Sequence, residues 1–224
     1  MTQDDVTTIE PAATQRHNHH GQRIGSKGER TRQVLIETTV RLLGEHGLRE
    51  VSVADVARAA KTSPATFYVY FRGVPEVVLA ALESAPQTSP TLEALMDRDW
   101  LASGGADAAR ALVEEYTELW ARNSTIFRVR NLAAEEGDPR FYNARLDAAR
   151  PTMEGLVGRV ALAQTAGQVP ARLEPRACLG TILMMLERLS AIGPLGTGRD
   201  DSPDFASLKD AAAHTIAAML GAHD

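Results

Sequence analysis

The sequence predicts an all-α fold: a three-helix N-terminal head that contains a helix-turn-helix, followed by a helical body, with about nine helices. Along most of the chain after residue 28, apolar residues recur at intervals of three and four, which is the spacing of one helix face. No stretch shows the alternation of apolar and polar residues that indicates a β-strand. Breaks in this pattern suggest an arm over residues 1–27, a head over 28–84 and a body over 85–224.

The composition favours a globular cytoplasmic protein. Of the 224 residues, 44% are hydrophobic, which is enough for a sizeable core. The single cysteine, Cys178, excludes an internal disulfide and fits a reducing compartment; it lies on an apolar stripe, so a core position is expected. No apolar run approaches the length of a membrane span, and the polar N-terminus lacks a signal-peptide core.

Residues 1–27 are polar and lack hydrophobic periodicity, so they are expected to be disordered. The run Arg16-His17-Asn18-His19-His20 contains imidazoles, which bind metals adventitiously. It lacks the second pair of ligands that a structural zinc site needs. Neither a metal site nor a cofactor is expected.

The first helix is predicted over residues 29–46, where it would brace the two helices that follow. Its expected inner face consists of Val34, Leu35, Thr38, Leu42 and Leu43.

Residues 51–62 predict a short helix followed by a tight turn. Ser52 is a good N-cap, and Asp55 three residues later completes a capping box. Lys61 and Thr62 form the turn to the next helix.

The next helix begins with Ser63 as its cap and Pro64 in its first position, where a missing N–H is tolerated. Phe67 and Phe71 fall on one side and are expected to pack inward. The opposite side and its flanks carry small side chains and two tyrosines: Ala65, Thr66, Val69, Tyr68 and Tyr70. Small side chains let a helix approach base edges, and flanking hydroxyls reach phosphates, so the pattern favours DNA binding. A solvated helical hairpin is the alternative.

The run Thr66-Phe67-Tyr68-Val69-Tyr70-Phe71 closely resembles the recognition segment of TetR/AcrR-type transcriptional regulators, usually T-[LF]-Y-x-[HY]-F. The family's Ala-x-x-Leu-Leu-x-x-x-Gly-Leu pattern also has a counterpart over residues 40–48, and the resemblance covers about residues 30–83. Two positions depart from it. Lys61 replaces the usual turn glycine, and Val74 replaces a lysine that normally contacts a phosphate, a contact for which Arg72 is the candidate substitute.

The resemblance implies that the head binds DNA. The expected contact residues are Ser52, Lys61, Ser63, Pro64, Ala65, Thr66, Tyr68, Val69, Tyr70 and Arg72. The tyrosines and cations would hold phosphates, and the small side chains would meet base edges and thymine methyl groups. Because the outward face lacks Arg, Asn and Gln, specificity is expected to depend on DNA shape, the arm or other contacts.

Charge is distributed unevenly along the chain. Residues 16–72 carry ten Lys/Arg against five Asp/Glu, whereas the whole chain has a net charge of −5. A basic head on an acidic body is typical of DNA-binding proteins. The arm is either a solvated tail or a further set of phosphate and minor-groove contacts from Arg16, Arg23, Lys27 and Arg30.

A strongly apolar fourth helix is predicted over residues 75–84, and Pro86, Ser89 and Pro90 mark a break after it. The expected helices of the body span 90–96, 106–123, 125–134, 139–166, 175–192 and 203–220. Pro151 predicts a kink in the longest of them.

The resemblance implies that the body pairs with a second copy, and two apolar faces on the last two helices support this. The expected interface residues are Leu179, Ile182, Leu189, Leu208, Ala212, Ile216 and Leu220. Gly180 and the alanine-rich run over 211–218 would allow close helix approach. The alternative is that both faces close the core of a single chain.

The resemblance also implies a small-molecule effector in the body. Large or adaptable side chains on helices that should converge are the candidates: Tyr116, Trp120, Phe127, Phe141, Met153, Leu183, Met184, Met185 and Leu186. Ordinary core packing is the alternative for each. Few polar residues interrupt this set, so the effector is expected to be hydrophobic and not highly charged. Glu187 and Arg188 lie beside it, either paired with neighbours or a partner chain, or as a polar anchor for the ligand.

The sequence therefore predicts a ligand-responsive repressor that binds a palindromic double-stranded operator as a homodimer, is released by a hydrophobic effector and has no membrane partner. The alternative is a helical small-molecule-binding or scaffold protein whose degenerate head does not bind DNA. Lys61 and Val74 favour that alternative, and the basic head opposes it. An enzyme is not expected, because the chain has no Gly-rich phosphate loop, nucleophile elbow or catalytic metal spacing.

Overall fold

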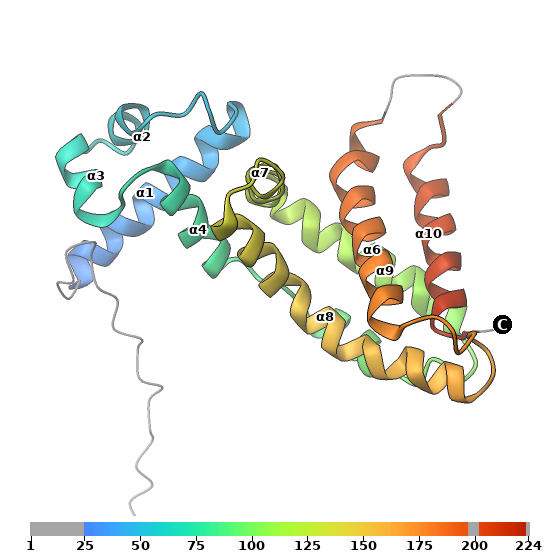
Figure 1. Ribbon diagram of the computed structural model, residues 1–224. Coiled ribbons are helices and arrows are strands. Elements are labelled where there is room, and N and C mark those ends of the chain that lie inside the picture. Colours follow the sequence, from blue (N-terminus) through green and yellow to red (C-terminus); the bar gives the residue numbers. More distant parts are fainter. Residues whose placement is uncertain (1–24, 197–201, 223–224) are drawn as a thin grey trace, which may run out of the picture. The chain divides into compact units, whose positions relative to one another are not determined.

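The computed structural model describes residues 25–196 and 202–222, which contain ten α-helices, one short 3-10 helix and no strand (Figure 1). The predicted all-α fold is confirmed. The His-rich run and all of the predicted arm up to residue 24 lie outside the described residues. The chain divides into two compact units, Met1–Val77 and Val78–Asp224. This division falls inside α4 (Val74–Ser84), earlier than the predicted boundary after residue 84.

The N-terminal unit contains α1 (Ser26–Glu45), α2 (Val53–Ala59) and α3 (Pro64–Tyr70), and α2 packs against both of the others. α1 buries Leu35, Ile36, Thr39 and Leu43. The expected inner position of Val34 was wrong: its side chain is 39% exposed, because Leu35, Thr39 and Leu43, spaced at four-residue steps, define the buried line. The buried Thr39 hydroxyl donates a hydrogen bond to the Leu35 carbonyl oxygen at 2.8 Å.

α4 begins one residue earlier than predicted and is apolar around much of its circumference. Its buried side chains are Val74, Val77, Val78, Ala80, Ala81 and Leu82. Consecutive buried positions show that more than one face of this helix is enclosed, as its composition predicted.

The C-terminal unit contains α5 (Pro90–Asp97), α6 (Gly105–Arg122), α7 (Ser124–Glu135), α8 (Pro139–Thr165), α9 (Pro175–Ile192), the 3-10 helix Gly193–Leu195 and α10 (Phe205–Met219). α6 packs against α9 and α10, and α8 packs against α7 and α9 (Figure 1). Three helices begin with proline behind a side-chain cap, from Ser89, Asp138 and Glu174. α10 begins at Phe205 rather than Pro203, because Asp204 caps it by accepting from the Ser207 N–H at 2.7 Å.

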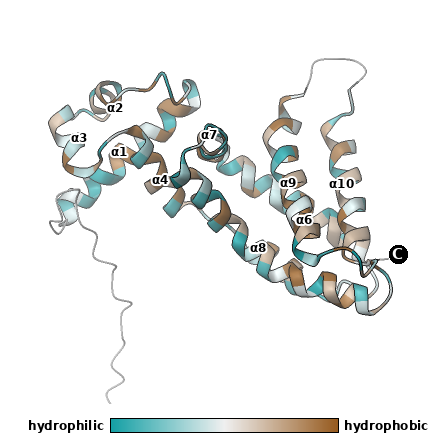
Figure 2. Cartoon of the chain, in the orientation of Figure 1, coloured by the Kyte–Doolittle hydropathy of each residue, from teal (hydrophilic) through white to brown (hydrophobic). Residues whose placement is uncertain are grey.

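The hydrophobic core of this unit contains the side chains expected at a dimer interface. Leu179, Ile182, Leu189, Ala212, Ile216 and Leu220 are buried in it, and Leu208 packs against it. This burial is what the alternative interpretation predicts, in which both apolar faces close the core of one chain. Figure 2 shows hydrophobic and hydrophilic positions mixed along the length of α9, as expected for a helix with one enclosed side.

The expectation that no apolar run approaches the length of a membrane span was wrong. By length and composition alone, Pro175–Leu195 is a stretch that could cross a membrane. Core residues such as Ile182 and Leu186, which are completely buried, explain its apolar character.

Candidate functional site

The orientation of α3 is set by its cap and by two aromatic anchors. Ser63 Oγ accepts from the Thr66 N–H at 3.0 Å and lies 3.0 Å from the Thr66 hydroxyl. Phe67 and Phe71 are 0% and 2% exposed, with ring centroids 5.9 Å apart. The Arg32 guanidinium lies 5.1 Å from the centroid of the Phe71 ring. The prediction that both phenylalanines pack inward is confirmed.

The anchors leave the opposite side of α3 open to solvent. Tyr68 is 50% exposed and Val69 37% exposed, and Ala65 is also exposed. Thr66 and Tyr70 are partly buried at the edges. A short helix held by a buried face, with methyl groups and a phenol outward, has the form required to enter a DNA groove.

The turn before α3 forms although its usual glycine is absent. Lys61 has φ 54°, and it is the one non-glycine residue with positive φ in the described ranges. This left-handed conformation is one that L-residues other than Gly, Asn and Asp rarely adopt. The exposed Lys61 side chain thus adds a cation beside α3 at the expense of backbone strain.

Ser52, expected to contact DNA, is engaged in the predicted capping box of α2. Its hydroxyl accepts from the Asp55 N–H at 3.2 Å, and the Asp55 carboxylate accepts from the Ser52 N–H at 3.2 Å. Hydrogen bonds from the Ser52 hydroxyl and then its N–H lower the pKa of Asp55. Ser52 thus orders the helix that supports α3.

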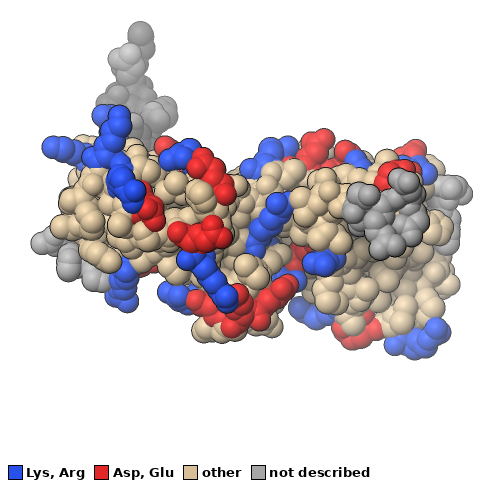
Figure 3. Space-filling view, turned by 90° about the horizontal axis from the view of Figure 1, so that it is seen from above, with Lys and Arg blue, Asp and Glu red and all other residues tan. Residues whose placement is uncertain are grey.

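Val74, the first residue of α4, stands where the family usually has a lysine, and Arg72 precedes the helix. Val74 is 6% exposed, so this position supplies packing and no cation. Arg72 is exposed, and its N–H donates to Glu76 Oε2 at 2.5 Å. In Figure 3, Lys and Arg side chains project along the margin of the N-terminal unit, at the left of the view.

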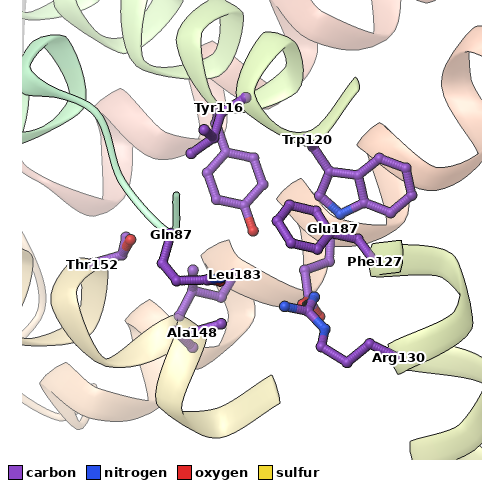
Figure 4. Close-up of a pocket in the computed structure, with 11 residues that line it drawn as sticks. Gln87, Tyr116, Trp120, Phe127, Arg130, Ala148, Thr152, Leu183 and Glu187 are labelled. Carbon is purple, nitrogen blue, oxygen red and sulfur yellow. Dashed lines mark hydrogen bonds and ion pairs between the residues drawn. The ribbon is translucent and has the colours of Figure 1, made fainter. Parts of the chain in front are cut away.

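The C-terminal unit contains a small, partly open cavity of about 30 Å³ among α6, α7, α8 and α9 (Figure 4). Its lining comprises Gln87, Tyr116, Leu119, Trp120, Phe127, Arg130, Ala148, Ala149, Thr152, Leu183 and Glu187. Four residues predicted to meet the effector lie here: Tyr116, Trp120, Phe127 and Leu183.

The other candidate effector residues lie elsewhere. Phe141 and Leu186 are completely buried without lining the cavity, and Met153 and Met185 pack against the core. Met184 is 60% exposed and lines an open hollow of about 290 Å³ on α7 and α9. Helical spacing alone did not separate these faces, because α9 is apolar over more than one side.

The cavity wall carries an ion network around Glu187, which the sequence suggested as a paired residue or a polar anchor without identifying its arginine partners. Arg130 Nη2 donates to Glu187 Oε1 at 2.9 Å, and Arg145 Nε donates to Glu187 Oε2 at 2.8 Å. The Arg130 and Glu187 side chains are 4% and 12% exposed. Burial lowers the pKa of Arg130, and the Glu187 carboxylate opposes that effect. The expectation of a pocket with few polar residues was therefore wrong.

The cavity adjoins two surface hollows. Trp120 and Glu187 line both the cavity and the α7–α9 hollow. Gln87 and Ala148 line both the cavity and a second hollow of about 380 Å³, whose other residues include Leu79 and Leu82 of α4. The described part of the C-terminal unit thus offers a line of spaces from α4 and α8 to α7 and α9.

Known protein families match both parts of the chain. Residues 35–81 match the model described as bacterial regulatory proteins, tetR family, and residues 92–195 match tetracyclin repressor-like, C-terminal domain. The HTH-type transcriptional regulator AqdR of Rhodococcus erythropolis is 33% identical over 69 residues, which are 31% of this chain and 33% of that protein. The chain therefore spans about a third of the length of that curated relative.

Solved structures share the fold along most of the chain. The fatty acid degradation regulator FadR from Bacillus halodurans has a TM-score of 0.59 and 16% identity, covering 84% of this chain and 94% of that one. A tetR-family regulator from Streptomyces coelicolor has a TM-score of 0.59 and 20% identity, covering 85% and 80%. FadR from Bacillus subtilis in complex with stearoyl-CoA has a TM-score of 0.58 and 15% identity, covering 85% and 99%.

At these identities the structures establish the fold alone, whereas the family models establish kinship across head and body. The chain therefore belongs to the tetR family of bacterial regulatory proteins, which are DNA-binding transcriptional regulators and not enzymes.

Proposed function

We propose that the protein is a cytoplasmic repressor that binds a palindromic operator as a homodimer and releases it when a small molecule occupies the body. The observation that carries this proposal is α3, which turns Tyr68 and Val69 to solvent while Phe67 and Phe71 hold it in place. Lys61 and Arg72, both exposed beside this helix, supply cations for phosphates. Two heads related by a two-fold axis read a palindrome with half-sites one helical turn, about 34–36 Å, or a multiple apart.

The dimer surface that we propose is the α7–α9 hollow, occupied by a second copy of the chain. Four large apolar side chains line it in the open: Leu132, Met184, Ile192 and Leu195, each between 44% and 65% exposed. Large apolar side chains exposed together, with charged residues around them, are typical of an interface. A family whose heads act in pairs needs such a surface, and the enclosed residues of α9 and α10 do not provide it.

The effector site that we propose is the partly open cavity together with the hollow on α4 and α8. α4 is continuous across the division between the two units, and Leu79, Leu82 and Glu83 of α4 line that hollow. A ligand that binds there contacts the helix leading into the head, and its differential affinity for two positions of α4 sets the size of the response. The likeness to a fatty acid degradation regulator and to a stearoyl-CoA complex makes acyl compounds the first class to test.

An electrophoretic mobility shift experiment with a random DNA duplex at low salt tests whether the head binds DNA. A retarded complex that dissociates as salt rises is the expected result, because phosphate contacts release counterions. Absence of any complex at low salt would instead support the scaffold alternative, in which the head is degenerate. Titration of the complex with acyl compounds then tests release.

A further inference from the structure

The Trp120 indole N–H, in the wall of the cavity, is a buried donor with no acceptor within residues 25–196 and 202–222. The Tyr116 hydroxyl lines the same cavity, as does Nη1 of Arg130, which is not used in the bonds from Arg130 to Asn131 and Glu187. Trp120 is 2% exposed and Arg130 is 3% exposed, and buried donors are almost always paired in folded proteins. Figure 4 shows the Tyr116 hydroxyl pointing toward the middle of the lining side chains. The cavity therefore holds no acceptor for the Trp120 N–H, although the Glu187 carboxylate lies in its wall.

The ion network behind this wall carries a net positive charge. Arg130 of the cavity and Arg145, which lines the adjoining α7–α9 hollow and not the cavity, share the single carboxylate of Glu187. Arg130 Nε turns away to Asn131 Oδ1 at 2.9 Å. Glu135 lowers this charge only from the exposed outer side, where solvent screens it. Burial and then the Glu187 charge raise the pKa of Tyr116, so its hydroxyl keeps the proton that it would donate. In a partly open site such a network favours an anion and disfavours a cation.

The cavity beside these donors shares two lining residues with a larger hollow. The cavity volume of about 30 Å³ suits a small polar group, whereas sites for whole ligands are usually about 300–1,000 Å³. Gln87 and Ala148 line both this cavity and the α4–α8 hollow of about 380 Å³, where Leu79 and Leu82 provide apolar surface. Room for an apolar chain is therefore on the α4 side of the donors.

We propose that the effector is an amphipathic anion, a carboxylate or related acidic group on an apolar chain, whose anionic oxygens accept from Tyr116, Trp120 and Arg130. Its chain passes Gln87 and Ala148 and lies along Leu79 and Leu82 of α4. This inference rests on the proposed effector site and names the class of ligand that fills it. Glu187 limits affinity, because its carboxylate already neutralises one of the two guanidiniums.

Calorimetric titration of the full-length protein without DNA tests the charge preference. The probes are dodecanoate, dodecanol and dodecylamine, which share one chain and differ in the terminal group. Dodecanoate should bind at least tenfold tighter than dodecanol, and dodecylamine should bind least. Equal affinity for dodecanoate and dodecanol, or a preference for the amine, overturns the proposal.

Variants of single groups locate the site. Tyr116→Phe removes one donor with little change in volume and should weaken dodecanoate severalfold while leaving dodecanol unchanged. Glu187→Gln, which removes the competing charge, should strengthen dodecanoate binding. Tyr142→Phe removes an exposed phenol on α8 that lines neither the cavity nor either hollow, and it should change neither ligand. An unaltered dodecanoate affinity in folded Tyr116→Phe and Glu187→Gln proteins contradicts the assignment.

The two levels of proposal fail separately. If the protein selects an operator but binds no amphipathic anion, the ligand class is wrong and the DNA-binding function stands. If dodecanoate binds with the predicted variant pattern but leaves the operator complex intact, the ligand class stands and its regulatory role is wrong.

Discussion

Arg130 on α7 and Glu187 on α9, far apart in the sequence, meet at 2.9 Å in the wall of a small cavity. Both side chains are nearly enclosed, at 4% and 12% exposure, and Arg145 of α8 completes the network on the second oxygen of the carboxylate. Three helices of the body are thus joined through one carboxylate.

Replacement of Glu187 with alanine should lower the free energy of unfolding by about 3–5 kcal/mol, because it leaves the buried Arg130 without its counter-charge. Urea denaturation measures the change. Glu118→Ala is the matched control: Glu118 pairs with Arg122 at 3.6 Å on the surface, where such pairs contribute about 0–1 kcal/mol. Similar losses in the two variants would show that the network adds no stability.

Lys61→Gly should stabilise the head by about 1 kcal/mol, because glycine adopts the left-handed conformation at φ 54° without strain. Lys61→Ala is the control, since it removes the same cation and keeps the strain. Both variants should weaken DNA binding and reduce the slope of log affinity against log salt by about 1. Equal stability of the glycine and alanine variants would argue against strain at this turn.

Tyr68→Phe should weaken binding to every DNA sequence similarly, by about tenfold, because the hydroxyl is assigned to a phosphate. Fluorescence anisotropy with a selected site and a random duplex measures both affinities. Tyr142→Phe, 51% exposed on α8, is the control and should have no effect. A change in sequence preference in the Tyr68 variant would mean that the hydroxyl contacts a base.

The capping box of α2 predicts a pH dependence. Hydrogen bonds from Ser52 lower the pKa of Asp55 in the folded state, so its ionised form adds stability above an unfolded pKa of about 3.9. That stability is lost as the pH falls through the folded value. The difference in stability between the protein and its Asp55→Asn variant should therefore be larger at about pH 5 than at about pH 3. A constant difference would assign no such role to the carboxylate.

Met184→Glu should break the proposed dimer, because it places a charge among exposed apolar side chains on the α7–α9 hollow. Light scattering after size exclusion should report the monomer mass for this variant and the dimer mass for the unaltered protein. His214→Glu, also exposed but on α10, is the control. A dimer that persists in Met184→Glu would place the interface elsewhere.

Local patterns predicted the head well. The caps at Ser52 and Ser63 and the inward turn of Phe67 and Phe71 depend on residues a few positions apart, and short-range spacing specifies them. The spacing of apolar residues, with breaks at proline and glycine, likewise predicted the long helices of the body.

The full lining of the cavity in the body and its ion network could not be predicted from the sequence. Arg130, Arg145 and Glu187 stand on different helices, and periodicity does not say which charged positions face each other. The wide apolar faces of α9 and α10 suggested an interface, yet residues such as Ile182 and Ile216 are in the core. An apolar stripe has the same pattern whether it meets its own chain or another.

Selection of bound sequences from a random duplex library tests the central claim most directly. The full-length protein, at low salt and without added ligand, should enrich a palindrome whose half-site centres are about one helical turn, or a multiple of it, apart. Binding that enriches no sequence, or only an asymmetric single site, would contradict a dimeric repressor that reads DNA with α3.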